Sequence, residues 1–187
     1  MNSASSDELE LLEQLLAEEG VARTPAADTI PRRPDGARVP LSFQQERLWL
    51  VHQLEPDSAA MNMSAALRLE GGLDVSALER TLSEIARRHD VLRTTFESGA
   101  EGLVQRIAPA GPFPIAVEET GGDEAAIAAR VRAEISRPFD LRHGPVFRAC
   151  LLRAGARTHV LIIALHHAIG DGWSIGVFTR ELGELYA

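Results

Sequence analysis

The feature that most constrains this 187-residue chain is an uninterrupted apolar run at residues 159–165, HVLIIAL. The run lacks the alternation of a half-buried strand, so it predicts a strand that is covered on both faces and central in its sheet. Residues 172–187 follow with apolar side chains at helical spacing, which predicts an amphipathic helix. The loop between these two elements holds two histidines and an aspartate. Loops held by rigid elements often carry function, so this junction is the first candidate site.

The rest of the pattern predicts an α+β fold in which helices pack on one mostly antiparallel sheet. Strands are expected at 61–70, 91–97, 103–107, 115–119 and 145–153, and helices at 41–54, 74–90 and 123–136. Ser42 is expected to cap the helix at 41–54. Leu48, Val51 and Leu54 are expected on the inner face of that helix.

The chain divides into three parts by composition. Residues 1–20 are acidic, and residues 5–20 predict a short helix with a leucine stripe. Residues 21–39 are rich in proline and lack periodicity, which indicates a linker. Residues 40–187 form the folded body. Two interpretations of the short helix stay open, because a helix of this length needs a surface: it packs as part of the linker, or it docks on a partner chain.

The charge distribution excludes several function classes. The formal net charge is −8, and residues 1–20 contribute much of it with six acidic and no basic side chains. Nucleic-acid binding is disfavoured because phosphate contacts need clustered Lys and Arg. No apolar stretch is long enough to span a membrane, and the N-terminus lacks the pattern of a secretory signal. The single cysteine, Cys150, fits the core of a protein in a reducing compartment, so we expect a cytoplasmic location.

A metal site at the histidine loop is not expected. His167 and Asp171 are four residues apart, a spacing that suits two ligands on one helix face. However, Gly170 and Gly172 disfavour a regular helix there, and no third ligand is near in the sequence. The remaining histidines are interpreted as structural or surface residues: His52, His89, His143 and His159.

Three motifs together resemble one known family. Residues 166–172, HHAIGDG, match the HHxxxDG motif of the condensation domains of nonribosomal peptide synthetases, which chloramphenicol acetyltransferase-like acyltransferases share. Residues 41–49 are similar to the family's opening motif S-x-A-Q-x-R-L-W, although Gln44 stands where alanine is usual, unless the string is offset by one. Residues 87–96 resemble R-H-E-x-L-R-T-x-F, with Asp90 in place of glutamate.

The resemblance implies a chloramphenicol acetyltransferase-like fold and an amide-forming reaction. Such a domain joins an acyl thioester on an upstream donor carrier protein to the amine of an aminoacyl thioester on a downstream acceptor carrier. Both substrates ride on phosphopantetheine arms, and no cofactor is bound directly. The matched motifs correspond to the N-terminal lobe of the family's two lobes. We therefore expect the C-terminal lobe to be missing from this chain, and the lobe alone to be inactive.

The resemblance also implies the role of His167, and the positions of His166 and Gly172 in the loop suggest roles for them. His167, the second histidine, is the expected catalytic residue, as a base or as a positioning group. His166 either supports the loop through a hydrogen bond or simply packs. Gly172 lies at the expected helix start, where its backbone N–H is a candidate donor to the oxyanion.

Asp171 is expected to be structural at the active site. In the family this carboxylate pairs with an arginine, and Arg93 is the preferred partner here, with Arg88 second. Because breaking a buried ion pair is costly, removing Asp171 or Arg93 is expected to cost soluble protein as well as activity.

Other functions remain as alternatives. One is a docking or carrier-recognition module without turnover, and another is a free-standing acyltransferase that uses a soluble thioester such as coenzyme A. The string at 87–96 and the pair Trp173–Ser174 favour the synthetase branch over the second. If Met1 is the native start, the donor comes in trans and residues 5–20 are the candidate docking element. If Met1 lies within a longer synthetase, residues 5–20 are an ordinary linker helix.

Overall fold

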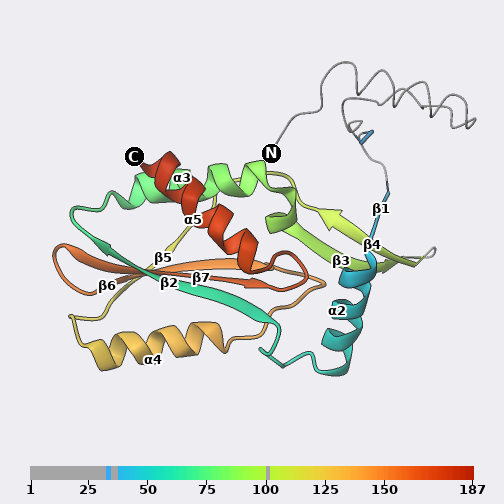
Figure 1. Cartoon of the computed structure of the whole chain (residues 1–187), viewed down its shortest axis with the longest axis horizontal. Helices are drawn as coiled ribbons and strands as arrows, with labels where there is room; N and C mark the ends of the chain where they lie inside the picture. Colours follow the sequence, from blue (N-terminus) through green and yellow to red (C-terminus); the bar gives the residue numbers. More distant parts are fainter. Residues whose placement is uncertain (1–32, 35–37, 100–101) are drawn as a thin grey trace, which may run out of the picture. The chain divides into compact units, whose positions relative to one another are not determined.

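The computed structural model describes residues 33–34, 38–99 and 102–187 (Figure 1). The chain divides into two compact units, residues 1–37 and residues 38–187. The expected helix at 5–20 and most of the expected linker therefore fall outside the described residues. In the part of the chain that is described, no helix is long and apolar enough to cross a membrane.

The body is built on a four-stranded sheet with the order β2-β7-β6-β5 (Figure 1). Its strands are β2 (Asn62–Glu70), β5 (Ala116–Glu119), β6 (Phe147–Arg153) and β7 (Thr158–His166). Only β5 and β6 pair in parallel; the other neighbours are antiparallel. The apolar run lies in β7, an interior strand, as its pattern predicts.

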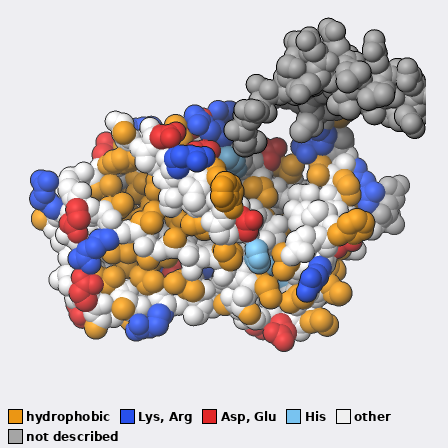
Figure 2. Space-filling model, in the orientation of Figure 1, with side chains coloured by type: hydrophobic (Ala, Val, Ile, Leu, Met, Phe, Trp, Pro, Cys, Tyr) orange, Lys and Arg blue, Asp and Glu red, His pale blue; other side chains and the backbone are white. Residues whose placement is uncertain are grey.

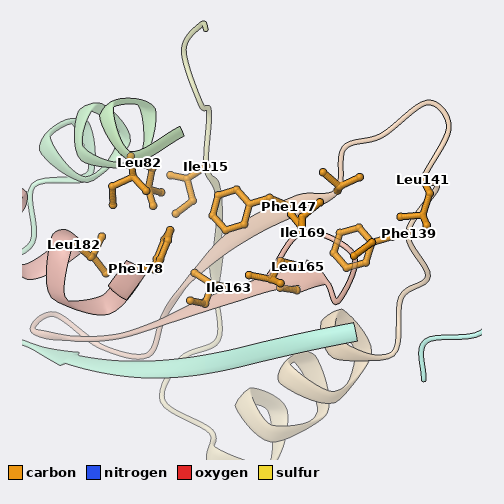
Figure 3. Close-up of a cluster of buried hydrophobic side chains, with 14 of the residues drawn as sticks. Leu82, Ile115, Phe139, Leu141, Phe147, Ile163, Leu165, Ile169, Phe178 and Leu182 are labelled. Atoms are coloured by element: carbon orange, nitrogen blue, oxygen red, sulfur yellow. The ribbon is translucent and has the colours of Figure 1, made fainter. Parts of the chain in front are cut away.

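Helices cover both faces of this sheet, which explains the apolar run. In Figure 1, α3 (Val75–Arg88) and α5 (Gly172–Tyr186) lie on one face, and α4 (Glu124–Ile135) lies on the other. Along β7, Leu161 and Ile163 enter the core beneath α3 and α5, as Figure 3 shows for Ile163. Val160 and Ile162 enter the smaller core beneath α4. Successive side chains of a strand point to opposite faces, so every position must be apolar. The predicted α+β fold, with helices flanking a mostly antiparallel sheet, is confirmed.

The prediction of a single sheet is wrong. A second sheet, with the order β1-β4-β3, is formed by β1 (Val39–Pro40), β3 (Thr94–Gly99) and β4 (Gly102–Ile107). A short 3-10 helix, η1 (Asp90–Arg93), leads from α3 into β3. Strand patterns identify strands but not their partners, so the separation into two sheets is not visible in the sequence.

The helix at the opening motif, α2 (Phe43–Leu54), has the predicted cap but a different inner face. Ser42 accepts a hydrogen bond from the Gln45 backbone, and the Gln45 side chain accepts one from Ser42 N. Leu48 is buried as expected, but Leu54 is 76% exposed. Each three-residue step falls short of a full turn, so Leu54 is rotated by about 120° from Leu48. The expected placement of Leu54 on the inner face is therefore wrong.

Candidate active site

The loop that carries the motif at residues 166–172, here called the histidine loop, is hydrogen-bonded to the residues that precede both strands beside β7. His166 N donates to the Val146 carbonyl at 3.1 Å, just before β6, and His167 N donates to the Met61 carbonyl at 2.8 Å, just before β2. Ile169 N closes a turn onto the His166 carbonyl at 3.0 Å. The two imidazoles therefore lie at a strand end that is hydrogen-bonded on both sides.

The geometry of His167 determines which ring nitrogen is available. Its Nδ1 lies 2.7 Å from the Gly170 carbonyl oxygen. A carbonyl only accepts, so Nδ1 carries the proton, and in the neutral ring Nε2 carries the lone pair. A Cβ at Gly170 would lie 3.2 Å from both Leu165 Cδ1 and Ser174 Cβ, so a larger residue here would need these side chains to shift. The loop thus presents a half-buried imidazole whose Nε2 can accept a proton.

His166 is held in the opposite tautomer. Its Nδ1 accepts the Ala168 N–H at 3.1 Å, so the proton resides on Nε2. The side chain is buried, with its ring edge-on to His52 at 5.9 Å and to Phe139 at 6.4 Å between centroids. Burial, with smaller contributions from His52 and His167, lowers the pKa of His166 to about 4. His166 therefore stays neutral near pH 7, and it both packs and makes a hydrogen bond within the loop.

The buried, neutral state of His166 predicts a loss of stability in mild acid. Its folded-state pKa is about 4, below the ordinary 6.5, so the unfolded chain binds the proton first. The contribution is complete above pH 6.5 and is lost as the pH falls toward 4, up to about 3 kcal/mol in unfolding free energy. Burial also lowers the pKa of His52, which acts in the same direction.

Urea unfolding of the chain between pH 7 and pH 4.5 measures this loss. A stability that is constant across this interval would contradict the prediction.

Asp171 caps α5. Its Oδ1 accepts the Ser174 N–H at 2.9 Å and the Ser174 hydroxyl at 2.7 Å, and Asp171 N donates back to Ser174 Oγ at 3.2 Å. These bonds to Ser174 lower the pKa of Asp171, and His167 adds a smaller effect in the same direction. Asp171 is exposed and starts the helix, which fixes where the loop ends.

The expected ion pair between Asp171 and Arg93 is not formed between these described residues, so this prediction is wrong here. Arg93 instead donates to Asp90, to the Ala108 carbonyl and, at 3.0 Å, to the Ala86 carbonyl. Arg93 follows the C-terminus of α3, where free helix carbonyls are the nearest acceptors.

Arg88, the second candidate partner, pairs with Glu84 at 2.7 Å. Without a buried pair, removal of Asp171 is expected to cost what a helix cap contributes rather than soluble protein.

The remaining histidines differ in environment. His89 Nε2 lies 3.0 Å from both carboxylate oxygens of Glu181, and His143 Nδ1 lies 2.8 Å from Asp140. His159 is buried, whereas His52 packs on His166. His52 is a site neighbour that the sequence did not reveal, because it lies far from the loop in the chain and carries no local signal. Among the described residues, no group of three His, Cys, Asp or Glu side chains is arranged to hold a metal ion.

Two apolar hollows lie beside α5. One of about 160 Å³ adjoins the loop and is lined by Leu165, Ile169, Trp173 and Val177, among others. Trp173 itself is 81% exposed. The other, of about 490 Å³, lies between α5 and the edge strand β2, where apolar side chains gather on the surface in Figure 2.

Comparison with known proteins identifies the family. The profile of the Condensation domain family matches residues 37–187. The chain is 46% identical over 158 residues to chondramide synthase of Chondromyces crocatus, covering 82% of the chain and 4% of that protein. It is 39% identical over 160 residues to cyclosporin synthetase of Tolypocladium inflatum, covering 86% of the chain and 1% of that protein. The chain therefore spans only a small part of the curated relatives that it matches.

Solved structures agree with the sequence matches. The X-domain from teicoplanin biosynthesis superposes with a TM-score of 0.76 at 35% identity, over 86% of this chain and 34% of that chain. The starter condensation domain of rhizomide synthetase gives a TM-score of 0.75 at 27% identity, over 80% of this chain and 37% of that chain. The chain thus spans about a third of the solved domains that it matches. The resemblance indicated by the three motifs is confirmed: the chain belongs to the condensation domain family and corresponds to the N-terminal portion of a nonribosomal peptide synthetase condensation domain.

Proposed function

We propose that this lobe supplies the histidine wall of an active site that forms an amide bond. The donor is an acyl or peptidyl thioester on an upstream carrier protein, and the acceptor is the amine of an aminoacyl thioester on a downstream carrier. The observation that carries the proposal is His167, whose Nδ1–H is engaged by Gly170 and whose Nε2 is left as the basic nitrogen.

The proposed step needs one proton acceptor. The amine nitrogen attacks the thioester carbonyl carbon, and the carbonyl π electrons move onto the oxygen. His167 Nε2 takes the proton that the nitrogen loses. Collapse of the tetrahedral species re-forms the carbonyl and expels the thiolate, which receives that proton. If His167 only orients the amine, the rate acceleration comes from placing two tethered substrates at attack distance.

Gly172 is the proposed oxyanion donor. It is the first residue of α5, where backbone N–H groups have no intrahelical acceptor and the helix dipole favours negative charge. Proline is tolerated at this first helical position and removes the N–H, and the extended backbone of the preceding Asp171 is compatible with it.

Replacing Gly172 tests this role with two matched variants. We expect Gly172→Pro to lower turnover about 10²-fold, whereas Gly172→Ala keeps the N–H and stays within about threefold of wild type. A Cβ at this position meets no atom within 4 Å, so the alanine variant is a fair control. Equal turnover in both variants, measured as amide product per minute, would remove Gly172 from the mechanism.

The substrates are proposed to arrive on phosphopantetheine arms, without a cofactor bound to the lobe. Residues 5–20 are proposed to contact the upstream carrier, through either their leucine stripe or their negative charge. Deletion of residues 1–38 tests this contact. We expect slower transfer from the upstream carrier and unchanged use of the acceptor. Unchanged transfer from both carriers would contradict the proposed contact of residues 5–20.

A second lobe is proposed to complete the site. The apolar groove between β2 and α5 is a candidate for part of the surface it covers, since exposed apolar area favours association. The decisive experiment compares this chain with a complete domain that carries it, each supplied with two loaded carriers. Amide product is expected from the complete domain only. A complete domain that binds carriers without making product would favour a docking module, and a preference for a soluble coenzyme A thioester would favour a free-standing acyltransferase.

A further inference from the structure

Arg148 is a mostly buried cation on β6, the strand next to the one that ends at His166. Its side chain is only 10% exposed. Nε donates to Glu134 Oε1 at 3.0 Å, Nη1 to the Pro138 carbonyl at 2.9 Å and Nη2 to the Arg137 carbonyl at 2.7 Å. The guanidinium therefore joins the C-terminus of α4, and the loop after it, to the sheet.

The same guanidinium stacks on a ring that contacts the histidine loop. Arg148 Cζ lies 3.7 Å from the ring centroid of Phe139, a cation–π geometry. Phe139 is 2% exposed and enters the buried cluster that contains Leu165 and Ile169 (Figure 3). The Phe139 ring meets His166 edge-on, with an interplanar angle of 84°. Arg148, Phe139 and His166 are thus joined by two successive contacts, a guanidinium stacked on the Phe139 ring and an edge-on contact between that ring and His166.

Asn62 makes a second connection at the same place. It lies opposite His166 in the β2–β7 ladder. Its Nδ2 donates to the Ile135 carbonyl at 2.7 Å and to the Arg137 carbonyl at 2.9 Å. Arg137 is therefore bound by both Asn62 and Arg148, so the end of α4 is fixed against the strand end that carries the imidazoles.

We propose that Arg148 is a positioning residue for the histidine loop. It holds Phe139 against His166, which keeps the His166 ring where its Nδ1 receives the Ala168 N–H. The following residue, His167, is placed by that turn. The catalytic part of this inference rests on the proposed amide-forming function. Lysine cannot replace arginine here, because an ammonium lacks the planar fork and stacks poorly on a ring.

A matched pair of variants tests the proposal. Arg148→Lys keeps a cation beside Glu134 but loses the fork and the stack. Arg130→Lys is the control, because Arg130 also pairs with Glu134, at 3.0 Å, and otherwise contacts Glu118 and Cys150. The first measurement is amide exchange of Ala168 in this chain, relative to Ile162 in the middle of β7. We expect Arg148→Lys to speed Ala168 exchange at least tenfold, and Arg130→Lys to leave the ratio unchanged.

The second measurement is turnover of a complete domain that carries each variant. We expect kcat to fall about tenfold for Arg148→Lys, with the KM for the acceptor carrier within about twofold. In a Phe139→Leu background, Arg148→Lys should have no further effect on kcat, because the stack is already broken.

The outcomes distinguish the positioning role of Arg148 from the proposed amide-forming function. Unchanged Ala168 exchange in Arg148→Lys, or an equal change in Arg130→Lys, overturns the positioning role. Faster exchange with unchanged kcat overturns its catalytic part. Additive effects with Phe139→Leu show that Arg148 does not act through the ring. A wild-type domain without turnover would overturn the proposed function, while the exchange ratio would still decide whether Arg148 orders the loop.

Discussion

Replacing His167 by glutamine is expected to lower amide formation by a complete domain by about 10²–10⁴-fold. Glutamine still offers an N–H to the Gly170 carbonyl, which in the wild-type chain receives the imidazole Nδ1–H at 2.7 Å. It has no basic nitrogen to accept the proton from the attacking amine. The loss should fall on kcat, because carrier binding does not depend on the proton acceptor.

The control for this variant is the same substitution at an exposed histidine. The His143 side chain is 74% exposed and pairs with Asp140. His143→Gln should keep turnover within about twofold of wild type. The measurement is single-turnover formation of the amide from two loaded carriers, with unfolding temperatures recorded for both variants. A His167→Gln domain that retains a tenth or more of the wild-type kcat would show that His167 is neither the base nor an essential positioning group.

Replacing Glu134 by leucine is expected to reduce the unfolding free energy of this chain by about 3–5 kcal/mol. The Glu134 side chain is 7% exposed and accepts from Arg148 and Arg130, each at 3.0 Å. Its removal leaves the Arg148 cation buried without a carboxylate. An unpaired charge in that position costs far more than a lost surface contact.

Glu118→Leu is the matched control, since it also removes a carboxylate from Arg130. The Glu118 side chain is 39% exposed, and its pair with Arg130 should contribute less than about 1 kcal/mol. Urea unfolding at pH 7 measures both variants. The double variant Glu134→Leu/Arg148→Met should recover part of the loss, because it removes both charges. A loss below about 1 kcal/mol for Glu134→Leu alone would mean that water or a neighbouring group already compensates Arg148.

The parts of the fold that local sequence determines were predictable. The strand at 159–165 and the cap at Ser42 follow from rules that act within a few residues, and both are present. The position of Leu54 was predicted wrongly because residues spaced by three rotate progressively around a helix and leave its inner face. The second sheet was missed for a different reason, since pairing between β1 and β4 joins residues more than sixty positions apart.

The same division applies to the site. The motif located His166 and His167 at a strand end, and the structure adds the two tautomers that their backbone partners impose. The pairing of Asp171 with Arg93 was taken from a resemblance. In the structure each of these residues instead binds a residue three positions away in the sequence, Ser174 for Asp171 and Asp90 for Arg93. Phe139 contacts His166 only because a loop distant in the sequence folds against it, so no local sequence pattern predicts this contact.

The alternation of side chains along β7 has a consequence for building chimeric synthetases. Leu161 and Ile163 serve one core, and Val160 and Ile162 serve the other. A splice that adds or deletes one residue within β7 would shift the register of the residues that follow it and turn their side chains toward the opposite layer. His166, at the end of the strand, would then leave its buried place beside His52 and Phe139. Junctions in this strand should therefore keep the number of residues in β7 unchanged, in addition to keeping the HHxxxDG motif.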